Sequence, residues 1–135
     1  MSAQRAGVDA EVLAAVQEQR RAHDRTWASV LGDGGLVDVQ VKELCAGYLA
    51  EDDDVVMHAD DETCFDERQG AALAWAHTIA WNPEAADDAL FERLHAHFSE
   101  PQLVELGTFI SLYLGQRNWL RTLGSLDELP LTRAR

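Results

Sequence analysis

Residues 99–124 read SEPQLVELGTFISLYLGQRNWLRTLG, and this stretch decides the fold class of the chain. Ser99 and Gln102 have the spacing of a capping box, in which each side chain satisfies a backbone N–H group at the start of a helix. Gly124 suits the end of a helix, because glycine accepts the left-handed backbone conformation found there. The stretch therefore predicts a helix over 101–123, about 34 Å long at about 1.5 Å per residue.

The middle of this helix is too apolar for one of its sides to be fully exposed to water. Eight of the twelve residues from 103 to 114 are apolar, whereas the surface helix of a globular protein has a polar face. Gly107, Ser111 and Gly115 form a row of small residues at four-residue spacing, which lets another helix approach closely. We therefore expect this helix at the centre of the domain or in an interface between subunits, and we expect a homo-oligomer.

Four further segments carry apolar residues at helical spacing; they cover residues 9–31, 37–50, 66–81 and 87–98. The segment 51–66 has eight carboxylates and no lysine or arginine, which favours a solvated loop or short helical turns. No segment shows the alternating pattern of a strand. The sequence therefore predicts an all-α fold, a compact helical bundle of about five helices. We expect a single domain over 1–135, with loose ends at 1–8 and 125–135.

The composition excludes several classes of partner. The formal net charge of −13 repels the phosphates of nucleic acids and anionic membrane surfaces. No run approaches the roughly 18 apolar residues that a membrane-spanning helix needs. Cys45 and Cys64 are the only cysteines, too few for the disulfide framework of a small secreted fold. We therefore expect a cytoplasmic protein that binds neither nucleic acid nor membrane.

The C-terminal half contains a series of short motifs whose order resembles the AhpD-like / carboxymuconolactone decarboxylase family. The motifs are Phe65-Asp66-Glu67-Arg68, Ala71-Ala72-Leu73, Ala76, Leu90-Phe91, His97-Phe98-Ser99, Gln102-Leu103-Val104-Glu105-Leu106, Arg117 and Leu123-Gly124. They span residues 65–124, and the order of the elements is more specific than any single motif. The resemblance implies a compact helical bundle that is commonly oligomeric.

The chain departs from this family in the catalytic half. The family's peroxidases carry a glutamate, then about a dozen residues later a Cys-x-x-Cys pair, and then a histidine. Glu43 occupies the place of that glutamate, but an ungapped count puts the two cysteine positions on Val55 and His58 and the histidine position on Glu62. The resemblance therefore implies a degenerate, redox-inactive member, and we expect no efficient alkyl hydroperoxidase (peroxiredoxin-type) activity.

The two cysteines do not restore that chemistry. Turnover of a peroxide needs an accessible thiolate of low pKa and a second thiol within reach. Cys45 falls on an apolar helical stripe, where burial raises a thiol pKa, and Cys64 falls in a strongly acidic stretch, where a second negative charge is disfavoured. Both surroundings oppose activation.

Acid/base chemistry at Glu43 and His58 is the alternative that needs no cysteine pair. The family's lactone decarboxylases suggest it by resemblance, with Arg117 fixing a carboxylate of the substrate. The competing interpretation of His58 and the acids around it is a solvated acidic loop. The spacing of Glu43, His58, Asp60, Asp61 and Glu62 matches no established ligand pattern, so we expect no metal site and no cofactor.

Trp75 and Arg117 are candidates for ligand binding. An indole can line a pocket, although aromatic residues at helical spacing are more often part of a core, and an arginine near the end of a helix can hold a carboxylate or complement the helix dipole. His95 and His97 point about 200° apart on a helix and cannot share one ion. The leading hypothesis is a small-molecule-binding or assembly module, and the alternative is a cysteine-independent enzyme.

Overall fold

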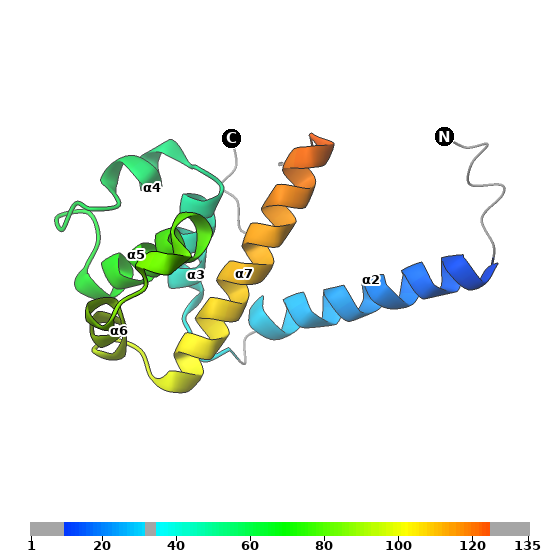
Figure 1. Ribbon diagram of the computed structural model, residues 1–135, viewed down its shortest axis with the longest axis horizontal. Helices are drawn as coiled ribbons and strands as arrows, with labels where there is room; N and C mark the ends of the chain where they lie inside the picture. Colours follow the sequence, from blue (N-terminus) through cyan, green and yellow to red (C-terminus); the bar gives the residue numbers. More distant parts are fainter. Residues whose placement is uncertain (1–9, 32–34, 125–135) are drawn as a thin grey trace. The chain divides into compact units, whose positions relative to one another are not determined.

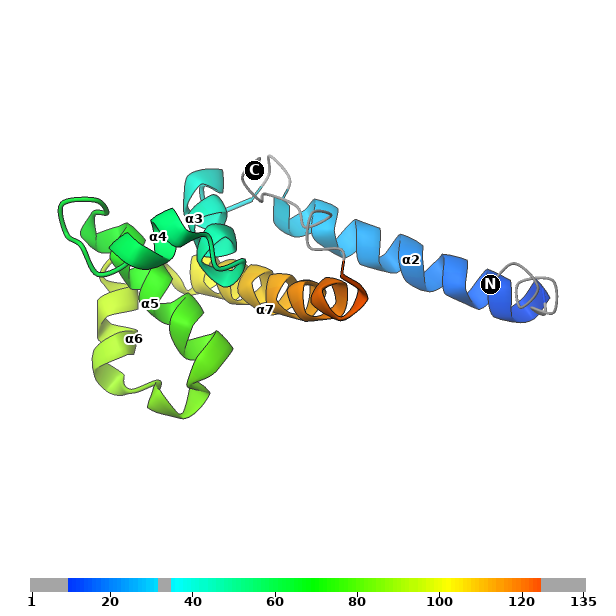
Figure 2. The same cartoon turned by 90° about the horizontal axis from the view of Figure 1, so that it is seen from above.

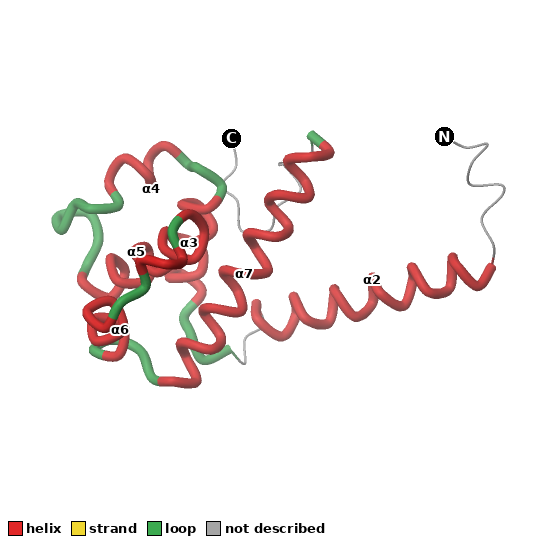
Figure 3. Tube along the Cα trace, in the orientation of Figure 1, coloured by secondary structure: helices red, strands yellow, loops and turns green. Residues whose placement is uncertain are grey.

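The computed structural model describes residues 10–31 and 35–124, and these residues form helices and no strand. The predicted all-α class is therefore confirmed, as Figure 1 and Figure 3 show. The elements are α2 (Ala10–Leu31), α3 (Val39–Leu49), α4 (Asp53–His58), α5 (Glu67–Trp81), the 3-10 turn η1 (Pro83–Ala85), α6 (Asp88–His95) and α7 (Glu100–Leu123). The ends that we expected to be loose, 1–8 and 125–135, lie outside the described residues.

The chain divides into two compact units, residues 1–35 and residues 36–135. The first contains α2, a helix whose Val12, Leu13 and Val16 side chains are more than half exposed. The second contains α3 to α7 and all the features discussed below. The expectation of a single domain over 1–135 stays a prediction.

In the second unit, α3, α5 and α7 surround the hydrophobic core. Figure 1 and Figure 2 show α5 between α6 and α3, with α7 alongside α3. The buried apolar side chains of these helices are Val41, Cys45, Ala46, Leu49, Ala71, Ala72, Leu73, Ala76, Leu103, Leu106, Phe109, Ile110, Tyr113 and Leu120. The small side chains of α5 let its neighbours pack closely, and one face of α7 lies against the core, which is one of the two positions that we expected for the long helix.

Side-chain caps define where α5 and α7 begin. Asp66 and Gln69 form a capping box at the start of α5, and Ser99 and Gln102 form another at the start of α7. Gly124 ends α7 with a positive φ of 74°, the conformation that favours glycine. These ends agree with the sequence-based boundaries to within one residue.

A buried ion pair fastens α7 to α3 and to the segment before it. The Lys42 ammonium lies 3.2 Å from a carboxylate oxygen of Glu105, and the two side chains are 2% and 14% exposed. Glu105 also accepts hydrogen bonds from the backbone N–H groups of Leu36 (2.9 Å) and Val37 (2.7 Å). Burial alone raises the pKa of Glu105, but these two donors and Lys42 together lower it below its usual value. The negative charge of Glu105 is therefore fully compensated inside the fold.

The small residues of α7 lie in two different environments, one packed against α5 and one open. A Cβ atom at Gly107 would lie 3.0 Å from the Trp75 ring, so this glycine allows the close contact between α7 and α5. A Cβ atom at Gly115 would meet nothing within 4 Å, and Ser111 is exposed. Among residues 10–31 and 35–124, the predicted close approach of another helix is therefore seen at Gly107 and not at Gly115.

Among the described residues, none of the helices has both the length and the apolar character needed to cross a membrane.

Candidate functional site

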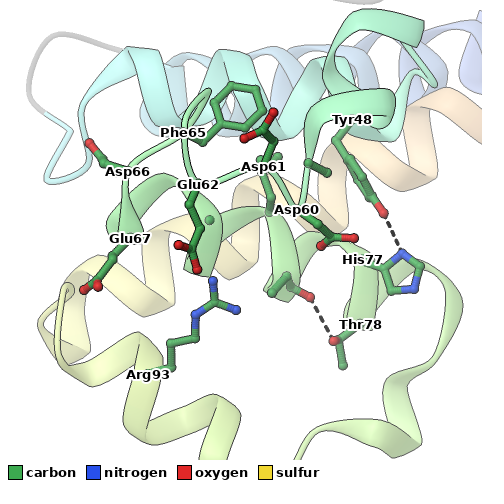
Figure 4. A pocket seen from close by; sticks show the side chains of 14 residues that line it. Tyr48, Asp60, Asp61, Glu62, Phe65, Asp66, Glu67, His77, Thr78 and Arg93 are labelled. Atoms are coloured by element: carbon green, nitrogen blue, oxygen red, sulfur yellow. Dashed lines mark hydrogen bonds between the residues drawn. The ribbon is translucent and has the colours of Figure 1, made fainter.

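A pocket of about 660 Å³ opens in the second unit, between the end of α3, the segment 59–67, α5 and α6. Leu73, Ala74 and Phe65 supply its apolar wall, as Figure 4 shows for Phe65. Its volume lies within the range of about 300–1,000 Å³ that small-molecule sites occupy. The pocket is therefore large enough for a small organic ligand.

Tyr48 and His77 form a hydrogen-bonded pair at one end of the pocket. The Tyr48 hydroxyl lies 2.7 Å from His77 Nδ1, across the gap between α3 and α5 (Figure 4). Burial, and then the charge of Asp60, raise the pKa of Tyr48, so the phenol keeps its proton. With a neutral imidazole, the phenol donates to Nδ1 and the ring proton sits on Nε2. The pair therefore offers hydrogen-bonding groups at this end of the pocket.

The pocket wall is strongly acidic. Five carboxylate residues line it, and the cations facing them are His77, when protonated, and Arg93; the acids are Asp60, Asp61, Glu62, Asp66 and Glu67. In Figure 4 the Arg93 guanidinium points toward Glu62. Gly70 makes room for it, because a Cβ atom there would lie 3.0 Å from a guanidinium nitrogen. The excess of carboxylates gives the pocket a negative field that favours a cation.

The two residues predicted to bind a ligand, Trp75 and Arg117, do not line this pocket. Trp75 packs against α7 at Gly107. Arg117 is only 6% exposed, donates to the carbonyl oxygen of Leu49 (2.9 Å), and lies over the Trp81 ring at 5.5 Å. Desolvation is the main cause that lowers the pKa of Arg117. Its contacts tie α7 to α3 and α5, so they give it a structural role.

Glu43 and His58, the predicted acid/base couple, lie outside the lining of the pocket. Glu43 is exposed on α3, and His58 is the last residue of α4; neither lines the pocket. Within the described part of the chain, no hydrogen bond or ion pair joins the two side chains. The acid/base couple therefore stays a prediction, without support from this geometry.

The cysteines have the surroundings that their positions in the sequence predicted. Cys45 is fully buried, its thiol lies 3.7 Å from the carbonyl oxygen of Ala72, and burial raises its pKa to about 12. Cys64 is exposed, and its thiol lies 3.4 Å from a carboxylate oxygen of Asp61. Desolvation, and then Asp61, raise the pKa of Cys64. Neither thiol is activated.

His95 and His97 have different partners, but α6 ends at His95, three residues before the predicted end at 98, so His97 lies in the turn after the helix rather than on it. His95 lies against Glu100, and His97 lies 3.8 Å from a carboxylate oxygen of Glu67. They share no partner within the described residues.

Sequence reasoning missed the pocket residues Tyr48, His77 and Arg93. They come from three helices, and the paired Tyr48 and His77 are 29 residues apart. No spacing rule connects such residues, although the acidic segment that forms the opposite wall was visible in the sequence.

Comparison with known proteins found no family model that matches the chain, no similar curated protein and no similar solved structure.

Proposed function

We propose that this chain is a small-molecule-binding helical domain whose pocket takes a polar ligand that carries positive charge, such as an amine. The observation that carries the proposal is the pocket itself, with its acidic wall facing a hydrogen-bonded Tyr48–His77 pair. Sites for small molecules combine apolar walls with a few polar groups that fix orientation. Leu73 and Phe65 supply the first kind of surface, and the pair and the carboxylates supply the second.

Electrostatics sets the sign of the ligand's charge. A ligand carboxylate would face five acidic residues of the lining, whereas an ammonium group would find acceptors on the same wall. One unit-charge pair about 4 Å apart contributes about 1 kcal/mol even in water-like surroundings. The field of the whole chain, with its net charge of −13, adds to this preference.

Spermidine and glutarate are suitable probes of opposite charge. We expect spermidine to bind, as measured by calorimetry at low salt, and to raise the melting temperature, which should increase with the logarithm of spermidine concentration once the site is saturated. Glutarate should do neither. Binding of glutarate in preference to spermidine would contradict the proposal.

A matched pair of substitutions separates pocket binding from attraction to the acidic surface in general. Glu62→Gln removes a carboxylate of the pocket, and Glu43→Gln removes an exposed carboxylate outside it. Both change the net charge equally. We expect Glu62→Gln to weaken spermidine binding about fivefold, the equivalent of about 1 kcal/mol, and Glu43→Gln to leave it nearly unchanged. Equal losses would show that the pocket is not the site.

We also propose that the chain forms homo-oligomers. The exposed side of α7 supports this, because Val104, Trp119 and Leu123 are 67%, 60% and 56% exposed. Large apolar side chains gathered on one helix favour burial against another surface. A second copy of the chain is the partner that we propose.

The resemblance to the AhpD-like family stays a proposal, and with it the redox-inactive character. Both cysteines are free, and the pKa of each thiol is raised, which supports a domain without peroxidase activity. Free thiols also suit the reducing cytoplasm that we propose as its compartment. The enzyme alternative, with proton transfer between Glu43 and His58, predicts that Glu43→Gln abolishes turnover of a lactone acid.

A further inference from the structure

Three potential metal ligands of different kinds meet where α4 ends. His58 offers an imidazole nitrogen, Asp61 a carboxylate oxygen and Cys64 a sulfur, and these atoms all lie within 4.8 Å of one another. Two of the three residues, His58 and Cys64, do not line the pocket described above. The cluster is therefore a separate constellation, which adjoins the pocket through Asp61.

Two successive turns of the backbone build this cluster. The N–H group of Asp61 donates to the carbonyl oxygen of His58 (2.9 Å), and the N–H group of Cys64 donates to that of Asp61 (3.0 Å). Each bond closes a turn of four residues, from 58 to 61 and from 61 to 64, so the side chains at 58, 61 and 64 gather at one place. The three ligands therefore come from seven consecutive positions.

The Asp61 carboxylate is held in position by Thr63. Its Oδ1 atom accepts hydrogen bonds from the Thr63 hydroxyl (2.6 Å) and the Thr63 N–H group (2.9 Å). These bonds leave the other oxygen, Oδ2, facing the Cys64 thiol at 3.4 Å. Hydrogen bonds from neighbouring groups commonly orient the carboxylate ligands of metal sites in this way.

We propose that His58, Asp61 and Cys64 bind a zinc-type transition-metal ion. Imidazole and thiolate ligands select zinc and related ions, whereas magnesium and calcium take oxygen ligands. Ligand atoms of a tetrahedral zinc ion lie about 3.3–3.8 Å apart, as follows from metal–ligand distances of about 2.0–2.3 Å. Since the three ligand atoms lie within 4.8 Å of one another, reaching that spacing requires each pair to approach by at most about 1–1.5 Å.

Binding replaces a proton with the metal. The Cys64 thiol now donates to Asp61 Oδ2; on binding, the S–H bond breaks, sulfur bonds to the ion, and the proton leaves to solvent. His58 and Asp61 contribute lone pairs, and no oxidation occurs. Asp60 and Glu62, on either side of Asp61, add negative field that favours the cation. Three protein ligands leave the fourth tetrahedral position to water, the arrangement of an open zinc site.

Cobalt(II) reports directly on the proposed ligands, because a cobalt–thiolate bond gives a charge-transfer band in the near ultraviolet. Protein without a polyhistidine tag is titrated with Co²⁺ alone, and then with Zn²⁺ to displace it. We expect one ion per chain, a charge-transfer band and visible absorption typical of four ligands. Calorimetry with Zn²⁺ should give the same stoichiometry.

Matched substitutions identify the ligands. We expect His58→Gln, Asp61→Asn and Cys64→Ser each to weaken Zn²⁺ binding at least about tenfold, and Cys64→Ser to abolish the charge-transfer band. The controls change the same residue types elsewhere in the chain: His97→Gln, Asp53→Asn and Cys45→Ala, the last with alanine because Cys45 is fully buried among apolar groups. They should bind like the wild type. Circular dichroism of each variant verifies that the helices are retained.

Thr63 is a positioning residue, and its variants separate positioning from ligation. Thr63→Ala should weaken Zn²⁺ binding by about 10–100-fold while the charge-transfer band stays, since the loss of such a supporting group typically has this size. Thr63→Ser should restore the affinity, because it keeps the hydroxyl that holds Asp61.

Three results would overturn the proposal. They are the absence of Co²⁺ and Zn²⁺ binding by the wild type, a charge-transfer band that survives Cys64→Ser, and displacement of Co²⁺ by equimolar Mg²⁺ or Ca²⁺. The last result would indicate an unspecific acidic surface. Because His58 and Cys64 do not line the pocket, none of these results depends on whether the pocket binds an amine.

Discussion

Lys42 is the only lysine in the chain, and its ammonium group lies inside the protein beside Glu105. Removal of one partner of a buried ion pair leaves the other charge uncompensated. Glu105 also holds the backbone N–H groups of Leu36 and Val37. One carboxylate on α7 thus contacts both α3 and the segment before it.

We expect Glu105→Gln to lower the free energy of unfolding by about 3 kcal/mol near pH 7, the cost typical of breaking a buried pair. The pKa of Glu105 is lowered from its usual value of 4.5, so its ionised form stabilises the fold above that pH. This contribution is lost as the pH falls through the lowered value. Urea denaturation should therefore show that the difference between variant and wild type shrinks in acid. A difference that stays constant down to strongly acidic pH would contradict this role.

The two thiols should differ sharply in reactivity. Cys45 is fully buried with a pKa raised to about 12, whereas Cys64 is exposed. Because the thiolate is the reactive form and must be accessible, we expect iodoacetamide to label only Cys64 in the native protein, and slowly. Mass spectrometry of the labelled peptides measures this, and denaturant should release Cys45. Rapid native labelling of Cys45 would show that the core opens around α3.

Two glycines of α7 provide a matched test at the level of the helix. Glycine inside a helix costs about 0.5–1 kcal/mol relative to alanine. Gly115→Ala should raise the free energy of unfolding by that amount, because a Cβ atom there meets nothing within 4 Å. Gly107→Ala should not increase the free energy of unfolding, because its Cβ atom would lie 3.0 Å from the Trp75 ring. Thermal unfolding of both variants decides; equal stabilisation would mean that Trp75 does not constrain α7.

The helices could be predicted from local signals because local chemistry defines their ends. Ser99, Gln102 and Gly124 predicted the start and the end of α7, and Asp66 and Gln69 have the same capping-box spacing at the start of α5. The short helix α4 was predicted only as a loop or short helical turns, because acidic residues dominate its surroundings. Two features stabilise it as a helix: Val55 is buried, and the Asp52 side chain caps its start by accepting a hydrogen bond from the Asp54 N–H group.

The sites could be predicted far less well, because they depend on contacts between elements. The pair Tyr48–His77 arises only when α3 and α5 pack together. The cluster of His58, Asp61 and Cys64 arises from two consecutive turns, which a solvated loop need not form. Arg117 was noticed for its charge, yet what decides its role is the Leu49 carbonyl group that it meets in the fold.

At the scale of the whole molecule, a net charge of −13 opposes association, whereas exposed apolar side chains favour it. Val104 and Trp119 are the most exposed large apolar residues of α7. They lie 15 positions apart, which is about 60° around a helix, so both belong to one side. Ile110, in contrast, lies fully inside the core, and a charge there would unfold the chain rather than test an interface.

We expect the wild type to form an oligomer at moderate salt, where screening weakens the repulsion between copies, and Val104→Glu with Trp119→Glu to shift it toward monomer. In the wild type, association with a second copy would remove these apolar side chains from water. In the variants it would bury an unpaired carboxylate instead, which costs more free energy than burial of the remaining apolar area provides. Phe91→Glu is the matched control, because Phe91 is an exposed apolar residue of α6 (41%). Sedimentation velocity at several concentrations measures the shift. A monomeric wild type, or equal dissociation by Phe91→Glu, would show that the exposed side of α7 is not the interface.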